Sequence, residues 1–383
     1  MHLAREIPGA PTLSHCNRRT LLQTASLVLP AIATIGARSV AHAGELKHAR
    51  LNVTENPFGP SPAAKRAIAQ SISQAAYYVE DEHALRDMIG KRENLPREKV
   101  ALSNGSLDAL SLLCTDIGLK GHIIAPQPGY STHLSYAARR GVKTRFVPLK
   151  NHQVDLAAMK NAINAETALV YLCNPNNPTG QMIPHDQLTD FCREVAKSIP
   201  IIIDEAYFEL LPAAMQQTMA SLVQSDLDII VTRTFSKVYG MAGLRIGYVL
   251  AQPARVRQLY SLTTTSRNQP GYAAAMACLG DEHYLAGAIE YLKTCRNMLY
   301  KICDENKLSY LNSQGTFVYI DTERSASAVK EALAQRGVDI RTFDAPGYET
   351  WIRVGTATPD ELKLFQKTLP AVLAAVSRSL KHG

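Results

Sequence analysis

Apolar runs rich in valine and isoleucine alternate with helix-like segments through the middle of the chain. Each run is short and bounded by Gly, Pro, Asn or Asp, which is typical of buried strands, whereas the segments between them carry apolar residues at helical spacing. This alternation predicts an α/β fold, in which helices cover both faces of a mostly parallel sheet. The predicted strands are 121–126, 144–148, 168–173, 200–204 and 229–233.

The pattern changes near Asp281, where a long helix is predicted instead of a further alternation. The order of elements after it predicts a second domain of the α+β kind, joined in space by the N-terminal segment near Leu51. The predicted elements that follow the long helix are a strand at 315–320, a helix at 326–335, a strand at 351–353 and a helix from Pro359.

The chain of 383 residues is long enough for two domains, because single cores rarely grow beyond about 250 to 300 residues. We find no internal repeat and no low-complexity tract. The predicted divisions are an export signal at 1–43, an N-terminal arm and part of the small domain at 44–75, a large cofactor-binding domain at 76–280 and a small C-terminal domain at 281–383.

The composition mainly excludes certain kinds of partner and binding site. With 46% hydrophobic and 20% charged residues, the chain has the make-up of an ordinary globular protein. The formal net charge is +7, but part of it lies in the first 43 residues, and no run of Lys and Arg is interleaved with aromatic residues. A nucleic-acid partner is therefore not expected. The seven cysteines show no CxxC spacing, which favours buried free thiols over a metal site or a disulfide framework.

The first 43 residues have the order of an export signal. Arg18 and Arg19 precede an apolar stretch at 27–35, and small residues follow at Ala41 and Ala43. Adjacent arginines before a modest apolar stretch are similar to the twin-arginine signal, so we expect cleavage near Ala43, a periplasmic protein and no stable membrane insertion afterwards. The alternatives are an uncleaved N-terminal helix or anchor and, if the leader does not function, a cytoplasmic protein. The apolar stretch is short and rich in Ala and Thr for a membrane helix.

The segment at 232–248 carries the strongest chemical signal. Lys237 stands between a hydroxyl-rich strand end and a glycine-rich turn, with Thr234 and Ser236 before it and Arg245 after it. A lysine that binds a cofactor as a Schiff base needs nearby hydroxyls and an arginine for a phosphate group. The alternative is a turn that binds phosphate only.

Three further segments place polar residues at strand ends. Asp204 ends the apolar run at 200–204, where ligands bind in open α/β sheets, although a helix N-cap is the alternative use of such an Asp. Asn177 lies in the turn after another apolar run, so it is expected at the same edge of the sheet. Gly105 and Ser106 form a turn and a helix start, which offers free N–H groups to a phosphate or serves as a simple cap.

Together these segments resemble the class I/II family of pyridoxal-phosphate (PLP)-dependent aminotransferases, and the histidinol-phosphate aminotransferase branch most closely. The resemblance extends from 51–59 to 352–355. It implies fold type I: a seven-stranded, mostly parallel sheet in the large domain, a small domain from both chain ends, and a homodimer with active sites at its interface. It also implies a transaminase that exchanges an amino group between an L-amino acid and a 2-oxo acid by a ping-pong mechanism.

The resemblance further implies the residues that bind PLP. Lys237 is the covalent attachment point and the carrier of the substrate α-proton, and Asp204 pairs with the pyridine nitrogen. Asn177 and Tyr207 bind the ring hydroxyl, and Tyr130 stacks on the ring. The residues expected around the phosphate are Ser106, Leu107, Thr234, Ser236 and Arg245, with Tyr78 or the neighbouring Tyr77 reaching the phosphate of the partner subunit.

For the substrate, the resemblance implies that Arg353 binds the carboxylate, with Arg341 and Asn56 also in contact. The alternative for Arg353 is a surface arginine paired with a residue such as Glu349. One departure from the family pattern stands at Thr54, where the usual residue before Glu-Asn-Pro is Asn. The substrate side chain therefore stays open. So does the reaction, because a decarboxylase, a C–S lyase or an amino-acid oxidase can use the same site, and a catalytically dead binding protein can keep the same fold.

Overall fold

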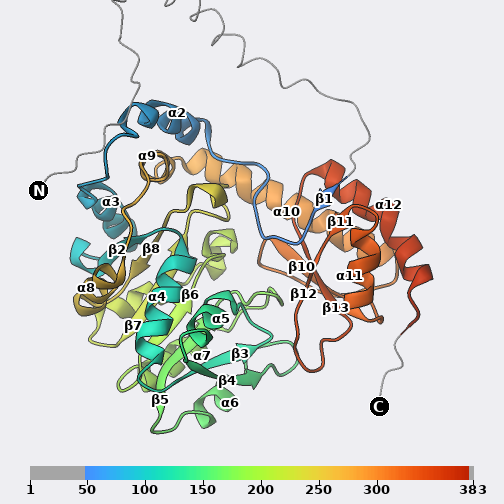
Figure 1. The fold of residues 1–383 in the computed structure, drawn as a ribbon, viewed down its shortest axis with the longest axis horizontal. Coiled ribbons are helices and arrows are strands. Elements are labelled where there is room, and N and C mark those ends of the chain that lie inside the picture. Colours follow the sequence, from blue (N-terminus) through green and yellow to red (C-terminus); the bar gives the residue numbers. More distant parts are fainter. Residues whose placement is uncertain (1–47, 379–383) are drawn as a thin grey trace, which may run out of the picture. The chain divides into compact units, whose positions relative to one another are not determined.

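The computed structural model describes residues 48–378, which belong to one compact unit of the chain. Its largest sheet has seven strands in the order β2-β8-β7-β6-β5-β3-β4 (Figure 1). Six of the seven strands run in one direction and β8 runs opposite to them, so the predicted mostly parallel, seven-stranded α/β fold is confirmed. The strands are β2 (Val100–Ser103), β3 (His122–Gln127), β4 (Lys143–Pro148), β5 (Thr167–Cys173), β6 (Ile201–Asp204), β7 (Ile229–Thr234) and β8 (Gly247–Leu250).

The central strands form where β-branched residues are consecutive. Every residue of β6 and β7 is buried, as is typical of parallel strands covered on both faces. All five predicted strands lie within one residue of their observed ends. The strand β8 was not predicted, because four residues that begin with glycine give no clear period.

Helices pack around this sheet, and α4 crosses it in contact with β5, β7 and β8. Together they enclose a core made mostly of Ile, Val, Leu and Ala side chains. The helices of this part are α2 (Pro62–Ser71), α3 (His83–Glu93), α4 (Ser106–Gly118), α5 (Thr132–Ala138), α6 (Leu156–Asn161), α7 (His185–Val195), α8 (Pro253–Leu262) and α9 (Gln269–Cys278).

A smaller antiparallel sheet has the order β12-β13-β10-β9 and packs with α10, α11 and α12 around a second core (Figure 1). The short strand β1 pairs in parallel with β11, so the N-terminal segment joins this part of the fold, as predicted. The elements are β1 (Ala49–Arg50), α10 (Glu282–Glu305), β9 (Ser309–Leu311), β10 (Phe317–Asp321), α11 (Ala326–Ala334), β11 (Val338–Asp339), β12 (Arg341–Thr342), β13 (Trp351–Gly355) and α12 (Pro359–Ala375).

The predicted division at residue 280 falls between α9 and α10, and the domain limits stay predictions. The export signal at 1–43 lies outside the described residues. Within residues 48–378, no helix is both long and apolar enough to cross a membrane. The six cysteines of this part are buried and free, as the sequence predicted.

The register of the large sheet brings three strand ends together. Cys173 pairs with Asp204, and Asp204 pairs with Thr232, so the carboxyl ends of β5, β6 and β7 are adjacent. Lys237 follows β7 by three residues. The sheet edge therefore gathers the polar residues that the sequence analysis placed after these strands.

Candidate active site

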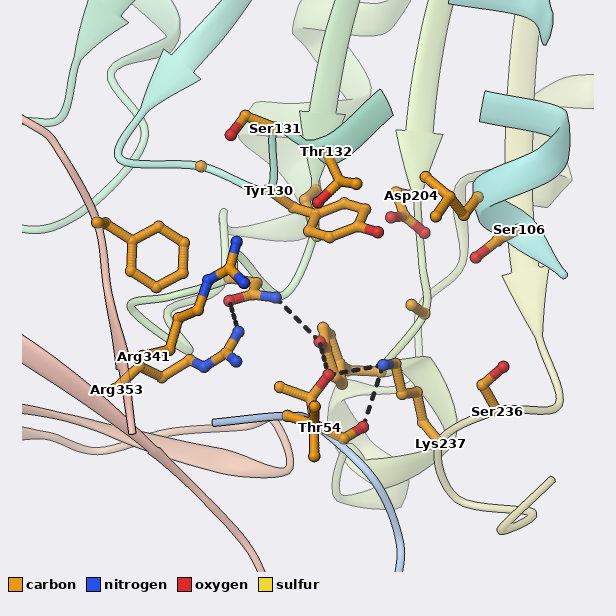
Figure 2. Close-up of a pocket in the computed structure, with 18 of the residues that line it drawn as sticks. Thr54, Ser106, Tyr130, Ser131, Thr132, Asp204, Ser236, Lys237, Arg341 and Arg353 are labelled. Carbon is orange, nitrogen blue, oxygen red and sulfur yellow. Dashed lines mark hydrogen bonds between the residues drawn. The ribbon is translucent and has the colours of Figure 1, made fainter. Parts of the chain in front are cut away.

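A cavity of about 680 Å³ opens at this edge, between the large sheet and the strands β12 and β13. All but two of the predicted site residues line it, although they come from segments spread over most of the described chain (Figure 2). These residues are Ser106, Leu107, Tyr130, Asn177, Asp204, Tyr207, Thr234, Ser236, Lys237, Arg245, Arg341 and Arg353.

Lys237 projects into the cavity from the turn after β7. Its Nζ donates hydrogen bonds to the carbonyl oxygen of Thr54 at 3.0 Å and to Thr54 Oγ1 at 2.6 Å. Burial lowers the pKa of Lys237 to about 8, and the positive charge of Arg353 acts in the same direction. An amine with this pKa exists in both protonation states near neutral pH, as a group that accepts and returns a proton requires.

Asp204 ends β6 and is 2% exposed. Its Oδ1 accepts a hydrogen bond from Thr232 Oγ1 at 3.0 Å, and its Oδ2 accepts one from Tyr171 at 3.4 Å. Burial raises the pKa of Asp204 to about 6, against the opposing effects of Thr232 and Lys237. The carboxylate thus lies in a position where a positively charged group in the cavity would be stabilised.

Asn177 and Tyr207 connect the two sides of the cavity. Asn177 Nδ2 donates to the Tyr207 hydroxyl at 3.2 Å, and that hydroxyl donates to Thr54 Oγ1 at 3.4 Å. On its other side, Asn177 Oδ1 accepts a hydrogen bond from Arg353 Nη1 at 2.9 Å. Burial raises the pKa of Tyr207, so its hydroxyl stays protonated and able to donate.

Arg353 lies on β13 and is 5% exposed, with its guanidinium carbon 5.5 Å from the ring centres of both Phe317 and Phe343. Its Nη2 donates a hydrogen bond to the carbonyl oxygen of Asn52 at 2.7 Å. Burial, with a further contribution from repulsion by Arg341, lowers the pKa of Arg353 to about 10. The surface alternative is therefore wrong, because Arg353 is buried in the cavity wall.

Arg341 pairs with Arg353 across the ladder of β12 and β13, so both side chains leave the same face of the small sheet. Arg341 is exposed and lies against the ring of Phe343 at 6.0 Å. Two cations thus line one end of the cavity (Figure 2).

The opposite end has the features of an anion site. The helix α4 begins at Ser106, so its first N–H groups are free of helical partners. Gly105 precedes it with φ +82°, and a Cβ there would lie 2.5 Å from Arg245 Nη2. Thr234 Oγ1 donates to Ser236 Oγ at 2.9 Å, and both residues line the cavity together with Arg245.

Two predicted site residues do not line this cavity. The Asn56 side chain donates to the carbonyl oxygen of Val238 at 2.7 Å and accepts from the N–H of Phe58 at 3.0 Å, so it ties the chain together beside the cavity. Tyr78 is 80% exposed and Tyr77 is 69% exposed. Both tyrosines are on the surface of the described chain.

The structure also adds residues that the sequence analysis gave no role. Thr54, which departs from the family pattern in sequence, contacts both Lys237 and Tyr207. His133 lies 4.2 Å from the Tyr171 ring, and burial lowers its pKa to about 3, so its imidazole is neutral. A lone histidine in an amphipathic segment gives no signal of this placement.

Comparison with known proteins identifies the family. The model of the family described as aminotransferase class I and II matches residues 47–366. The chain belongs to this family. It is 32% identical over 329 residues to the histidinol-phosphate aminotransferase of Moorella thermoacetica, with 85% of each chain covered. The predicted enzyme class, a PLP-dependent aminotransferase, is confirmed.

Solved structures agree with this assignment. The histidinol-phosphate aminotransferase of Sinorhizobium meliloti, solved in complex with pyridoxal-5'-phosphate, is 29% identical with a TM-score of 0.79 and covers 85% of this aminotransferase and 91% of its own chain. The fold alone is shared with the L-threonine-O-3-phosphate decarboxylase of Porphyromonas gingivalis, at 19% identity and a TM-score of 0.69, covering 85% and 99% of the two chains. The fold thus does not select the reaction, which depends on the side chains of the cavity.

Proposed function

We propose that the cavity binds PLP and that the enzyme uses it to transfer an amino group from an L-amino acid to a 2-oxo acid by a ping-pong mechanism. The main support for this proposal is a chain of hydrogen bonds that connects two cationic side chains. Arg353 donates to Asn177, and Asn177 donates to Tyr207. Tyr207 and Lys237 both donate to Thr54. A guanidinium suited to a carboxylate and an amine suited to proton transfer therefore flank one group of side chains.

The residues of the cavity fit this cofactor. The buried carboxylate of Asp204 suits a protonated ring nitrogen, because a positive partner would offset the desolvation that now raises its pKa. The start of α4 and the Arg245 guanidinium beside Gly105 suit a phosphate dianion. The phosphate would be held by Ser106, Leu107, Thr234, Ser236 and Arg245, the ring by Asp204, Asn177, Tyr207 and Tyr130, and the covalent link by Lys237.

PLP, when bound, supplies an electron sink that stabilises negative charge on the substrate α-carbon. The chain supplies the orientation and the proton transfer. Arg353 holds the substrate carboxylate, which directs the α-hydrogen towards Lys237. The Nζ of Lys237 would accept this proton and deliver it to the carbon of the cofactor that receives the amino group. Asp204 would keep the ring nitrogen of the bound cofactor protonated, because its carboxylate can accept that N–H.

The second arginine favours a substrate whose side chain ends in an anion. Arg341 is exposed to the cavity and carries its charge next to Arg353, so a carboxylate or phosphate at the far end of the substrate would have a cationic partner. The relatives named histidinol-phosphate aminotransferases agree with an anionic substrate. We expect L-glutamate, L-aspartate or O-phospho-L-serine to react about tenfold or more faster than L-alanine, since one charge-assisted hydrogen bond contributes about 1.5 to 3 kcal/mol.

A half-reaction assay tests the proposal. The holoenzyme is mixed with one amino acid and no acceptor, and the visible spectrum, the oxo acid and the released gas are measured. Transamination predicts one equivalent of oxo acid for each active site and no carbon dioxide. Carbon dioxide release would favour a decarboxylase, and oxo acid beyond one equivalent with oxygen uptake would favour an oxidase. The control, Lys237→Ala, should make no product.

Two further parts of the proposal concern the whole protein. The order of charged, apolar and small residues in 1–43 supports export to the periplasm by a twin-arginine-like route. Replacing Arg18 and Arg19 with lysine should then retain the precursor in the cytoplasm. Wild-type protein found only in the cytoplasm and starting at Met1 would contradict export.

The exposure of Tyr77 and Tyr78 supports a homodimer in which one of them reaches the partner subunit, and sedimentation of the holoenzyme tests this.

A further inference from the structure

Thr54 accepts two hydrogen bonds from the ε-amine of Lys237. Its side chain and its own carbonyl oxygen both accept hydrogen bonds from Nζ, at 2.6 Å and 3.0 Å. Thr54 is 8% exposed, so water competes little for these two acceptors. Figure 2 shows Thr54 on the wall of the cavity, directly beside Lys237.

The two hydrogen bonds to Thr54 fix the direction of the third substituent position on Nζ, which holds either a hydrogen or the lone pair. The Nζ atom is tetrahedral, so two N–H groups bound to Thr54 leave one further direction free beyond the bond to the side chain. That direction carries a lone pair in the neutral amine and an N–H in the ammonium. The position that gains and loses a proton is therefore turned away from the two Thr54 acceptors, on an amine whose side chain lines the cavity.

Thr54 is itself held from both sides. Before it, the carbonyl oxygen of Asn52 accepts from Arg353 Nη2 at 2.7 Å. After it, Asn56 Nδ2 donates to the carbonyl oxygen of Val238, the residue next to Lys237, at 2.7 Å. The short segment 52–56 is therefore anchored to the substrate side of the cavity at one end and to the turn that carries Lys237 at the other.

A β-branched threonine also restricts the direction of its hydroxyl, because χ1 has few allowed values. The same Oγ1 accepts from the Tyr207 hydroxyl at 3.4 Å, which limits rotation further. An isolated threonine used only for packing would not need a buried hydroxyl aimed at two functional groups.

From these contacts we infer that Thr54 is a positioning residue for Lys237: it holds the ε-amine whenever the amine is free and directs its exchangeable position at the substrate α-carbon. This role rests on the proposed function, since only an enzyme that releases and re-forms the bond to Lys237 needs a resting place for the free amine. It assigns a purpose to the position where the sequence departs from the family pattern.

The test compares Thr54→Val, which removes the hydroxyl but keeps the shape, with Thr54→Ser, which keeps the hydroxyl. Thr189→Val is the matched control, because Thr189 is 9% exposed, lies on α7 and contacts His185 and Met219 instead of the cavity. If Thr54→Val does not fold, Thr54→Ala replaces it. Thermal melting of each holoenzyme confirms folding before the other measurements.

The first readout is the titration of Lys237 itself. When the cofactor carries the amino group taken from the substrate, it is not bonded to Lys237, so the lysine amine is free. Competitive acetylation of this form from about pH 6 to 10, quantified at Lys237 by mass spectrometry, gives the pKa of the amine. Loss of an acceptor disfavours the ammonium, so Thr54→Val should lower the pKa by about one to two pH units. Thr54→Ser and Thr189→Val should match the wild type.

The second readout is proton transfer. In Thr54→Val we expect kcat to fall about tenfold to a hundredfold, with KM changed less than threefold, and the isotope effect on an α-deuterated substrate to rise. Thr54→Ser should recover most of the rate. An unchanged Lys237 titration together with a kcat within about twofold of wild type in Thr54→Val would overturn the inference.

The two proposals fail differently. If the wild-type enzyme forms no oxo acid from any amino acid, the proposed function fails. Acetylation of Lys237 in the cofactor-free chain then still tests the contact with Thr54, because the hydrogen bonds in question do not involve the cofactor.

Discussion

Replacing Arg353 with lysine keeps the positive charge but removes the planar fork. Two of the guanidinium's donors are already used, by Asn177 Oδ1 at 2.9 Å and the carbonyl oxygen of Asn52 at 2.7 Å. A guanidinium has five N–H donors, so three remain for a substrate carboxylate, enough for two parallel hydrogen bonds. A lysine amine has three donors on one atom, and it cannot bind Asn177, Asn52 and both carboxylate oxygens together.

The magnitude follows from the lost contacts. Charge-assisted hydrogen bonds contribute about 1.5 to 3 kcal/mol each, and the substitution removes at least one to the substrate and loosens its orientation. We therefore expect Arg353→Lys to lose about 3 kcal/mol of transition-state binding, which is about 10²-fold in kcat/KM, while the affinity for PLP changes little.

Steady-state kinetics on any accepted amino acid, with PLP affinity measured separately, checks this expectation. Arg296→Lys is the matched control, because Arg296 is 8% exposed and donates to the carbonyl oxygen of Gly315 without lining the cavity. An unchanged kcat/KM in Arg353→Lys, or an equal loss in Arg296→Lys, would refute the assignment of Arg353 to the substrate carboxylate.

Three further outcomes are expected. Asp204→Ala should still bind PLP but lose several orders of magnitude in rate, since an unprotonated ring is a poor electron sink, and near-normal turnover would refute its role. In the cofactor-free chain, acetylation of Lys237 should reach half its maximum near pH 8, because burial disfavours the ammonium, and should increase as the pH rises through that value; a midpoint near that of exposed lysines would contradict the buried environment. Arg233→Met should lower the free energy of unfolding in urea by about 3 to 5 kcal/mol, because Arg233 is fully buried against Glu93, Glu205 and Glu209. The control Lys363→Met, at an exposed ion pair, should lower it by under about 1 kcal/mol. Equal losses in the two variants would contradict this reasoning.

Much of the fold was predictable because it depends on local patterns. Consecutive β-branched residues specify buried strands such as β6 and β7, and the residue that follows each strand inherits its place at the sheet edge. Asp204 and Lys237 could therefore be assigned to one site from their positions after strands. The roles taken from the family resemblance, such as those of Tyr130 and Arg341, came with the order and spacing of several segments together.

The tertiary structure decided what depends on residues far apart in the chain. Lys237 and Thr54 are separated by 183 positions, and Arg353 and Asn177 by 176, so no local period relates them. The order of strands in the sheet, with β8 antiparallel between β2 and β7, follows from packing and not from the four residues of β8.

Asn56 illustrates the limit of an assignment by position. The residues just before it line the cavity, but its own amide is used by Val238 and Phe58. A sequence indicates which residue types occupy an edge or a turn, since backbone period is local. The direction of each side chain depends on which distant group satisfies it, and a buried polar atom accepts whichever partner the folded chain brings within hydrogen-bond distance.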